Sequence, residues 1–196
     1  PSVATLSNGN FVVTWSSYGQ DGRSNSEVYG QIFSSNGIKQ GIEFKVNTFT
    51  SDQNNPLVAT LNNGEFLVTW NSRGKDGSRY GIYGQLFNNN GIKQGIEYKL
   101  SMDSDGHTSI STFSNNNFVM TWGALDGDSY RVYGQIFSFS DLLNSTATPF
   151  VSQSPSHTIS LSLTSTVTLS ASPSISSSHI IANAIPDKIY ATFALE

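Results

Sequence analysis

The segment that decides the fold is residues 11–15, with the sequence FVVTW. It recurs as FLVTW at residues 66–70 and as FVMTW at residues 118–122, so the three tryptophans stand 55 and 52 positions apart. Each copy is followed by an Asp-Gly pair and then by YGQIF or YGQLF. These pentapeptides begin at Tyr29, Tyr83 and Tyr133. Matched segments at a nearly constant spacing indicate three copies of an internal repeat.

Each repeat predicts four short antiparallel strands, because runs of alternating apolar and polar residues are separated by turn dipeptides. In the first repeat these runs cover residues 3–6, 11–15, 28–33 and 43–46. Asn-Gly pairs follow the first and third runs, and they predict tight type I′ hairpin turns. The pairs lie at residues 8–9, 36–37, 63–64 and 90–91. We therefore expect each repeat to form a four-stranded meander.

The composition agrees with an all-β fold, because 37% of the 196 residues are hydrophobic and only 12% are charged. The net charge of −4, with scattered Lys and Arg, offers no basic surface for nucleic acid or an anionic membrane. The chain has no Cys for a disulfide or a thiolate metal site. No apolar run is long enough to span a bilayer. Since the chain starts at Pro1 without a leader, we expect a processed chain or a piece of a longer one.

Three repeats of four strands predict a pseudo-threefold, propeller-like or prism-like body over residues 1–150. The repeats span about residues 1–55, 56–107 and 108–150. The third repeat loses the pattern after its third strand, which is typical of a terminal cap. The alternative is a fragment of a larger β-propeller. Beyond the body we expect a Ser/Thr-rich extended segment over residues 151–178 and a C-terminal strand segment over residues 179–196.

The tryptophans belong to an apolar stripe, because Phe11, Val13 and Trp15 project to one face of their strand. We expect all three tryptophans to pack in the core, with an aromatic sugar-binding platform as the alternative. The glycine after each tyrosine of the YGQ segments lies in mid-strand, where it costs stability unless a large ring comes close. We expect Trp15, Trp70 and Trp122 to lie over these glycines.

The complete repeat pattern resembles the Trp-containing, blade-like repeats of very large secreted adhesins and calcium-dependent repeat proteins. The resemblance covers about residues 1–150 and rests on the PxVAxL, NGxFxVTW, Asp-Gly, YGQxF, Asn-Gly and EFKVN segments. It implies display outside the cell or at the cell surface, many β modules in series and no catalytic residues. Residues 184–188 (AIPDK) also resemble the start of a cadherin-like module.

The region after Val151 is different in character, because more than half of residues 152–178 are Ser or Thr. Its apolar residues alternate with polar ones, which predicts a strand over residues 158–169. We expect this strand, and a second one within residues 180–195, to join the sheet of a neighbouring copy. The alternatives are a solvated spacer and a tail that folds back as a closing strand. The predicted assembly residues are Ile159, Leu161, Leu163, Val167 and Leu169.

Glycosylation is predicted on the same region, because Ser/Thr-rich segments with Pro are typical of O-glycosylated stalks. One N-glycosylation triplet, residues 144–146 (NST), precedes it. The candidate residues are Asn144, Ser160, Ser162, Thr164, Thr166, Thr168 and Ser170.

The Asp-Gly turns are the candidates for a cation site, because carboxylates could supply hard oxygen ligands to calcium. Their aspartates are Asp21, Asp76 and Asp126, and Asp103 and Asp105 add a local pair. Simple turn formation is the preferred interpretation of these residues. The histidines (His107, His157 and His179) are far apart in the sequence and receive no role. No phosphate-binding loop or nucleophile elbow is present, so we expect no catalytic residues, no cofactor and no enzyme.

The leading functional hypothesis is a glycosylated structural subunit of an extracellular filament or surface layer, assembling head to tail with copies of itself through the C-terminal tail. The alternative is a carbohydrate-binding or adhesin module, which fails if all three tryptophans are buried. A hydrolase on a propeller would need carboxylates that face one channel.

Overall fold

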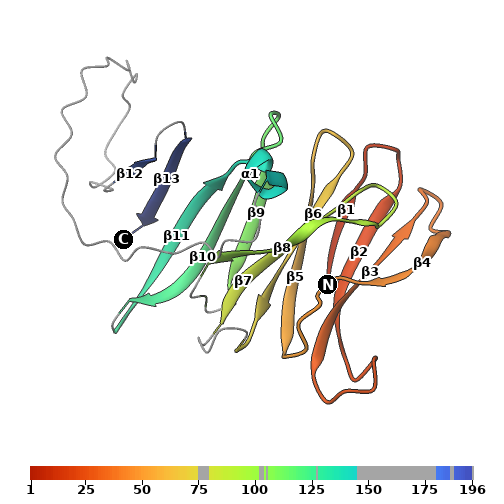
Figure 1. The fold of residues 1–196 in the computed structure, drawn as a ribbon. Coiled ribbons are helices and arrows are strands. Elements are labelled where there is room, and N and C mark those ends of the chain that lie inside the picture. Colours follow the sequence, from red (N-terminus) through yellow and green to blue (C-terminus); the bar gives the residue numbers. More distant parts are fainter. Residues whose placement is uncertain are drawn as a thin grey trace.

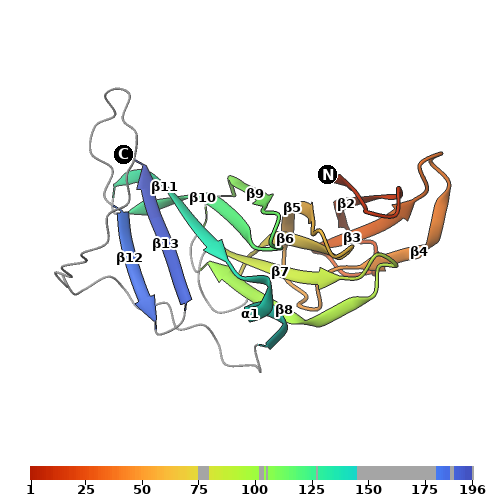
Figure 2. The same ribbon diagram turned by 90° about the horizontal axis from the view of Figure 1, so that it is seen from above.

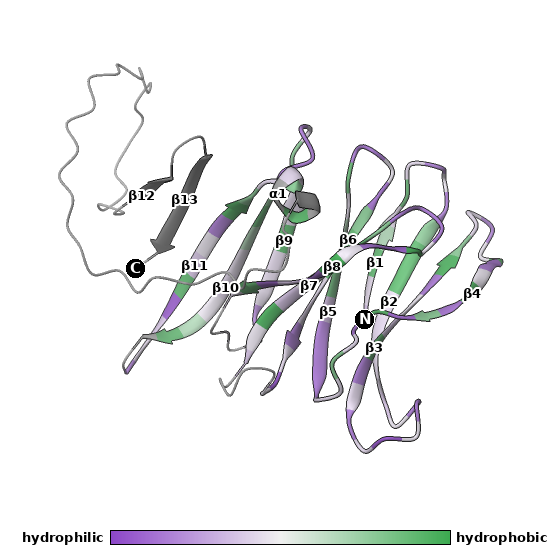
Figure 3. Cartoon of the chain, in the orientation of Figure 1, coloured by the Kyte–Doolittle hydropathy of each residue, from purple (hydrophilic) through white to green (hydrophobic). Residues whose placement is uncertain are grey.

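The computed structural model describes residues 1–74, 80–101, 104, 106–126, 128–144, 180–185 and 188–195. These residues form three antiparallel sheets and one short helix, α1 (Phe139–Asn144). The predicted all-β class and the antiparallel sheets of the three repeats are therefore confirmed. Figure 3 shows that part of β2 (Phe11–Tyr18) is hydrophobic, whereas the loop that follows it is hydrophilic.

The first sheet is a meander in the order β1-β2-β3-β4, and the second sheet has the equivalent order β5-β6-β7-β8. The first sheet consists of β1 (Ser2–Thr5), β2 (Phe11–Tyr18), β3 (Ser26–Phe33) and β4 (Lys39–Lys45). The second consists of β5 (Gln53–Thr60), β6 (Phe66–Ser72), β7 (Gly81–Phe87) and β8 (Lys93–Ser101).

The third sheet has three strands of its own repeat and two from the end of the chain, in the order β12-β13-β11-β10-β9. They are β9 (Thr108–Thr112), β10 (Phe118–Asp126), β11 (Ser129–Phe137), β12 (Ile180–Ile185) and β13 (Lys188–Leu195). β13 pairs antiparallel with β11, as β4 does with β3 and β8 with β7. Within the chain, β12 and β13 therefore complete the third sheet, and the expectation that they join a neighbouring copy is corrected. The lost fourth strand of the third repeat leaves an edge that β13 fills.

The three sheets lie in a row and pack face to face, with the second sheet in the middle (Figures 1 and 2). One apolar core joins the first and second sheets, and another joins the second and third. β5 lies beside β1 on one side and beside β9 on the other. Neither core joins the first sheet to the third, so the row is open, and the expected closed pseudo-threefold body is not what the described residues form.

The hairpin turns differ in detail from the prediction. In the first turn the Gly9 N–H donates to the Leu6 carbonyl at 3.0 Å, and Gly9 has a φ of +82°. Asn8 keeps a negative φ, whereas a type I′ turn needs positive φ at both central residues. In the third repeat, Asn116 takes the glycine's place with a φ of +65°. Each turn therefore needs one residue with positive φ, and Gly or Asn supplies it.

The mid-strand glycines make room for residues other than tryptophan. A Cβ on Gly30 would lie 2.6 Å from the Phe44 ring, and one on Gly84 would lie 3.0 Å from Leu100 Cδ1. Gly30 pairs with Thr14, so it faces the opposite side of the sheet from Trp15. The expectation that the tryptophans cover these glycines was wrong. Instead, Phe44 reaches over Gly30 into the core between the first two sheets, 5.2 Å from Phe87 between ring centroids.

Candidate functional site

The first sheet has one face that no other sheet of the described residues covers, and we call it the open face. Strand alternation and the pairing of Val3 with Val13 and of Phe11 with Phe33 place its side chains together. Its apolar side chains are Val3, Phe11, Val13, Trp15 and Phe33. The Phe11 and Phe33 rings stack with their centroids 5.3 Å apart. The pairing of Val13 with Gln31 and of Trp15 with Tyr29 places the buried side chains of Gln31 and Tyr29 on the same face. Val3 is 64% exposed and Trp15 is only half-buried, so water reaches part of this largely apolar face.

The same side chains are buried in the second sheet, because the first sheet lies on them. Val58, the equivalent of Val3, is 8% exposed, and Trp70, the equivalent of Trp15, is 2% exposed. Phe66 and Phe87 stack at 5.2 Å and belong to the core shared with the first sheet. In the second sheet this face is therefore an interface between sheets.

The third sheet repeats the arrangement, since Trp122 is buried in the core shared with the second sheet. The expected core packing is confirmed for Trp70 and Trp122. Trp15 differs because it is only half-buried and no other sheet of the described residues packs on its face. The three tryptophans therefore do not form one exposed platform for a glycan.

A second surface that no other sheet of the described residues covers lies at the other end of the row, on the side of the third sheet that faces away from the second. We call it the end face, and its side chains are Val119, Thr121, Leu125, Tyr130, Val132 and Ile136. Val132 is 41% exposed, whereas its equivalents Val28 and Ile82 are buried. The row of sheets thus ends in two different apolar faces.

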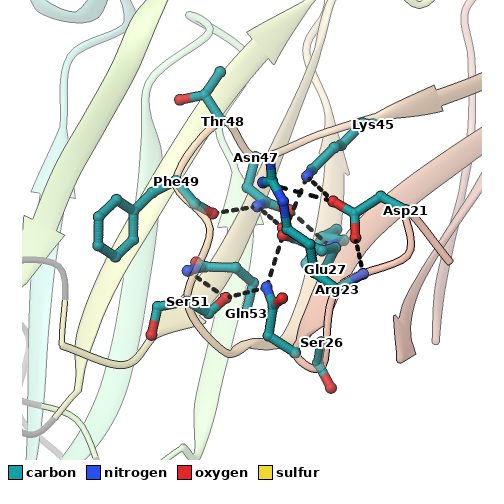
Figure 4. Close-up of polar contacts among 12 residues, drawn as sticks. Asp21, Arg23, Ser26, Glu27, Lys45, Asn47, Thr48, Phe49, Ser51 and Gln53 are labelled. Atoms are coloured by element: carbon teal, nitrogen blue, oxygen red, sulfur yellow. Dashed lines mark hydrogen bonds and ion pairs between the residues drawn. The ribbon is translucent and has the colours of Figure 1, made fainter. Parts of the chain in front are cut away.

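A polar cluster lies where the loop after β2 meets β4 (Figure 4). The Glu27 carboxylate is fully buried, and the Lys45 ammonium lies 3.1 Å from it and 3.0 Å from the Asp21 carboxylate. Arg23 also contacts Asp21, at 3.8 Å. A buried carboxylate is costly unless it is paired and hydrogen-bonded, and Lys45 supplies the pairing here.

The pKa values of this pair reflect the contact. The hydrogen bond from Lys45 is the largest influence on Asp21 and lowers its pKa below the ordinary 3.8. Partial burial on its own would lower the pKa of Lys45, but the hydrogen bonds with Asp21 and Glu27 outweigh it and raise that pKa above 10.5. Both groups are therefore charged at neutral pH.

The cluster extends into the segment that connects the first two sheets. Asn47 donates to Glu27 and to the Phe49 carbonyl, and it accepts from the Val28 N–H at 2.7 Å. Gln53 then accepts from the Trp70 indole N–H at 2.7 Å. These bonds fix the connection between β4 and β5, so the cluster positions the second sheet on the first.

Sequence reasoning missed the cluster of Glu27, Lys45 and Asn47 because Glu27 is not repeated, although Lys45 has a counterpart in Lys99. Gly81 and Arg131 stand where Glu27 stands in the first repeat. The signal in the sequence was the position of Glu27, a strand position at which the three repeats have different residue types.

The calcium candidates fall in different places. Asp21 is engaged by Lys45 and Arg23, so the cation beside its carboxylate is the chain's own ammonium group. Asp76, Asp103 and Asp105 lie outside the described residues, and of Asp126 the structure describes only its place at the end of β10. The described part of the chain holds no group of three His, Cys, Asp or Glu side chains that could bind a metal.

The remaining predicted residues are mostly beyond the described ranges. Asn144 is the last residue of α1. The other glycosylation candidates, the five assembly residues and the strand over residues 158–169 lie outside the described residues. Of the helices that the structure describes, none has the length and hydropathy to cross a membrane.

Comparison with known proteins gives matches among solved structures alone. No protein-family model matches the sequence, and no curated protein does either. Among solved structures, an endo-arabinase from Bacteroides thetaiotaomicron matches 65% of the chain, with a TM-score of 0.44 and 16% identity. The chain spans about half of that enzyme, since 51% of it is covered.

The expectation that the chain is not an enzyme is corrected by this comparison. A solved structure that matches part of the chain is an enzyme. With a TM-score of 0.44 and 16% identity, this match assigns neither a fold family nor a substrate to this chain.

Proposed function

We propose that the chain is a structural β-sheet module of an extracellular assembly, whose first sheet receives another sheet on its open face. One observation carries the proposal. Val3 is 64% exposed and Trp15 is half-buried, whereas Val58 and Trp70 at the same positions are buried beneath a neighbouring sheet. A face of this composition gains free energy when it is covered, at about 25 cal/mol for each Å² of apolar surface.

The extracellular setting belongs to the same proposal and is supported by the resemblance to repeats of secreted adhesins. A filament or surface layer is a structure in which such modules work in series, and a larger propeller is another. Both need the open face to accept a sheet, so one experiment addresses their common basis.

The experiment places an extra repeat on the open face. A duplicate of residues 1–55 fused directly before Pro1 recreates the junction between Asn55 and Pro56. We expect the added sheet to cover the original Trp15, which would shift its fluorescence to shorter wavelength and protect it from acrylamide quenching. The same fusion with Trp15→Phe in the original repeat isolates the signal of that tryptophan. If Trp15 stays as quenchable as in the unextended chain, the open face does not receive a sheet and the proposal fails.

A second candidate is saccharide binding at the open face, because a half-buried indole on a flat sheet offers a stacking surface. Titration with a panel of neutral polysaccharides, monitored by tryptophan fluorescence, tests it. Binding that is lost in Trp15→Ala would favour this candidate over sheet stacking.

A further inference from the structure

We infer that the sheet received by the open face is the third sheet of a second copy of this chain, so that copies associate head to tail. This inference rests on the proposed function and adds the identity of the partner. It uses the two uncovered surfaces of the row together, the open face of one copy and the end face of the next.

The first argument is that the chain already contains this interface twice. The side of the second sheet that carries Phe66, Val68 and Trp70 packs on the side of the first sheet that carries Val12, Val28 and Ile32. The third sheet packs on the second in the same way, through Phe118, Met120 and Trp122. The internal interfaces thus join one kind of face to the other kind, and never two faces of the same kind.

The second argument is that the end face carries the residues such an interface needs. Val119, Val132 and Ile136 occupy the positions of Val12, Val28 and Ile32 in the first sheet. Thr121 likewise corresponds to Thr14, and Gly134 to Gly30. The end face of a second copy therefore presents to the open face the same pattern of residues that the first sheet presents to the second sheet.

The third argument is the size of the contact. In the first sheet β2, β3 and β4 have seven or eight residues and β1 has four. At about 3.3 Å per residue and about 4.8 Å between strands, this sheet has a face of roughly 400 Å². Two such faces bury on the order of 1,000 Å², near the lower limit for a specific protein interface. We therefore expect reversible association at high protein concentration. The two partners use different surfaces, so the contact propagates into a ring or a fibre and does not close as a dimer.

The test uses one blocked variant for each face. Val13→Lys places a charge on the open face, and Val132→Lys places one on the end face. Ile42→Lys is the matched control, because Ile42 on β4 is 88% exposed and lies on neither face. Tyr130→Lys, at a 70% exposed position of the end face, repeats the block if Val132→Lys is not folded by circular dichroism.

Sedimentation equilibrium from about 10 µM to about 1 mM gives the outcome, since these concentrations cover weak specific contacts. We expect the average mass of the wild type and of Ile42→Lys to rise with concentration, and each blocked variant alone to remain monomeric. An equal mixture of the two blocked variants retains one intact pair of faces, so it should reach twice the monomer mass and stop there. A monomeric wild type, a monomeric mixture, or one blocked variant that dimerises alone would each overturn the inference. A monomeric wild type together with a protected Trp15 in the fusion would leave the proposed function intact.

Discussion

The first and second sheets contain nearly the same residues at matched positions, yet they use them differently. Trp70 is 2% exposed beneath the first sheet, whereas Trp15 is half-buried on a face that no described sheet covers. Conversely, the first sheet has the buried Glu27 with its Lys45 partner, and the second sheet has Gly81 at the position of Glu27. Burial is therefore set by the neighbour of a sheet, and repetition of the sequence alone does not set it.

The largest expected effect concerns these two tryptophans. Trp70→Ala should lower the free energy of unfolding by about 3–5 kcal/mol, because it removes a large ring from a packed core together with its hydrogen bond to Gln53. Trp15→Ala should cost roughly 1–2 kcal/mol in the monomer, since that ring is already partly in water. Urea unfolding at low protein concentration measures both. Equal costs would mean that the two faces are covered alike, and the contrast between the sheets would disappear.

The next effect concerns the polar cluster. Lys45→Met leaves the buried Glu27 carboxylate without its cation, which costs about 3–5 kcal/mol for a fully buried pair. Because the Lys45 side chain is 29% exposed, we expect a smaller loss of roughly 2–3 kcal/mol.

Lys99→Met is the matched control for this variant, because Lys99 pairs with Tyr83 as Lys45 pairs with Tyr29. Lys99 Nζ lies 5.9 Å from the centroid of the Tyr83 ring, and Gly81 occupies the Glu27 position there. Lys99→Met therefore strands no buried carboxylate at that position, and its loss should be the smaller of the two. Thermal unfolding of both variants gives the comparison. A larger loss for Lys99→Met would show that the cluster does not distinguish the two sheets.

The mid-strand glycines provide a third comparison. Gly30→Ala would place its Cβ 2.6 Å from the Phe44 ring, which is held against Phe66 and Phe87 and has little room to move. We expect a loss of about 2–3 kcal/mol in the free energy of unfolding. Gly84→Ala meets the end of the Leu100 side chain at 3.0 Å, which can rotate, so about 1 kcal/mol is expected. Denaturant midpoints of the two variants check the order, and the reverse order would mean that Phe44 yields more easily than Leu100.

Much of the fold could be predicted from the sequence, because the repeated FVVTW and YGQIF segments show strand alternation directly. The four strands of the first repeat and the burial of Trp70 and Trp122 follow from that alternation. The open row could not be predicted, because whether three sheets close depends on the angle between them, which no local pattern encodes. The place of Phe44 over Gly30 depends on an irregularity in the pairing of β3 with β4. The cluster around Glu27 was missed since it occurs in one repeat alone.

The smallest expected effect is the pH dependence that Asp21 gives to the first sheet. The pKa of Asp21 is lowered in the folded chain from its ordinary 3.8, so its contribution is present above that value and is lost as the pH falls through the lowered pKa. The pKa of Lys45 is raised from 10.5, so its contribution is complete below that value and is lost as the pH rises through the raised pKa. The difference in unfolding free energy between the wild type and Asp21→Asn should therefore be constant from about pH 5 to pH 9 and should decrease at both extremes. Because Asp21 is partly exposed, added salt should reduce this difference. A difference that does not change at either extreme would mean that Asp21 acts only as a turn residue, and that Glu27 alone holds Lys45 in place.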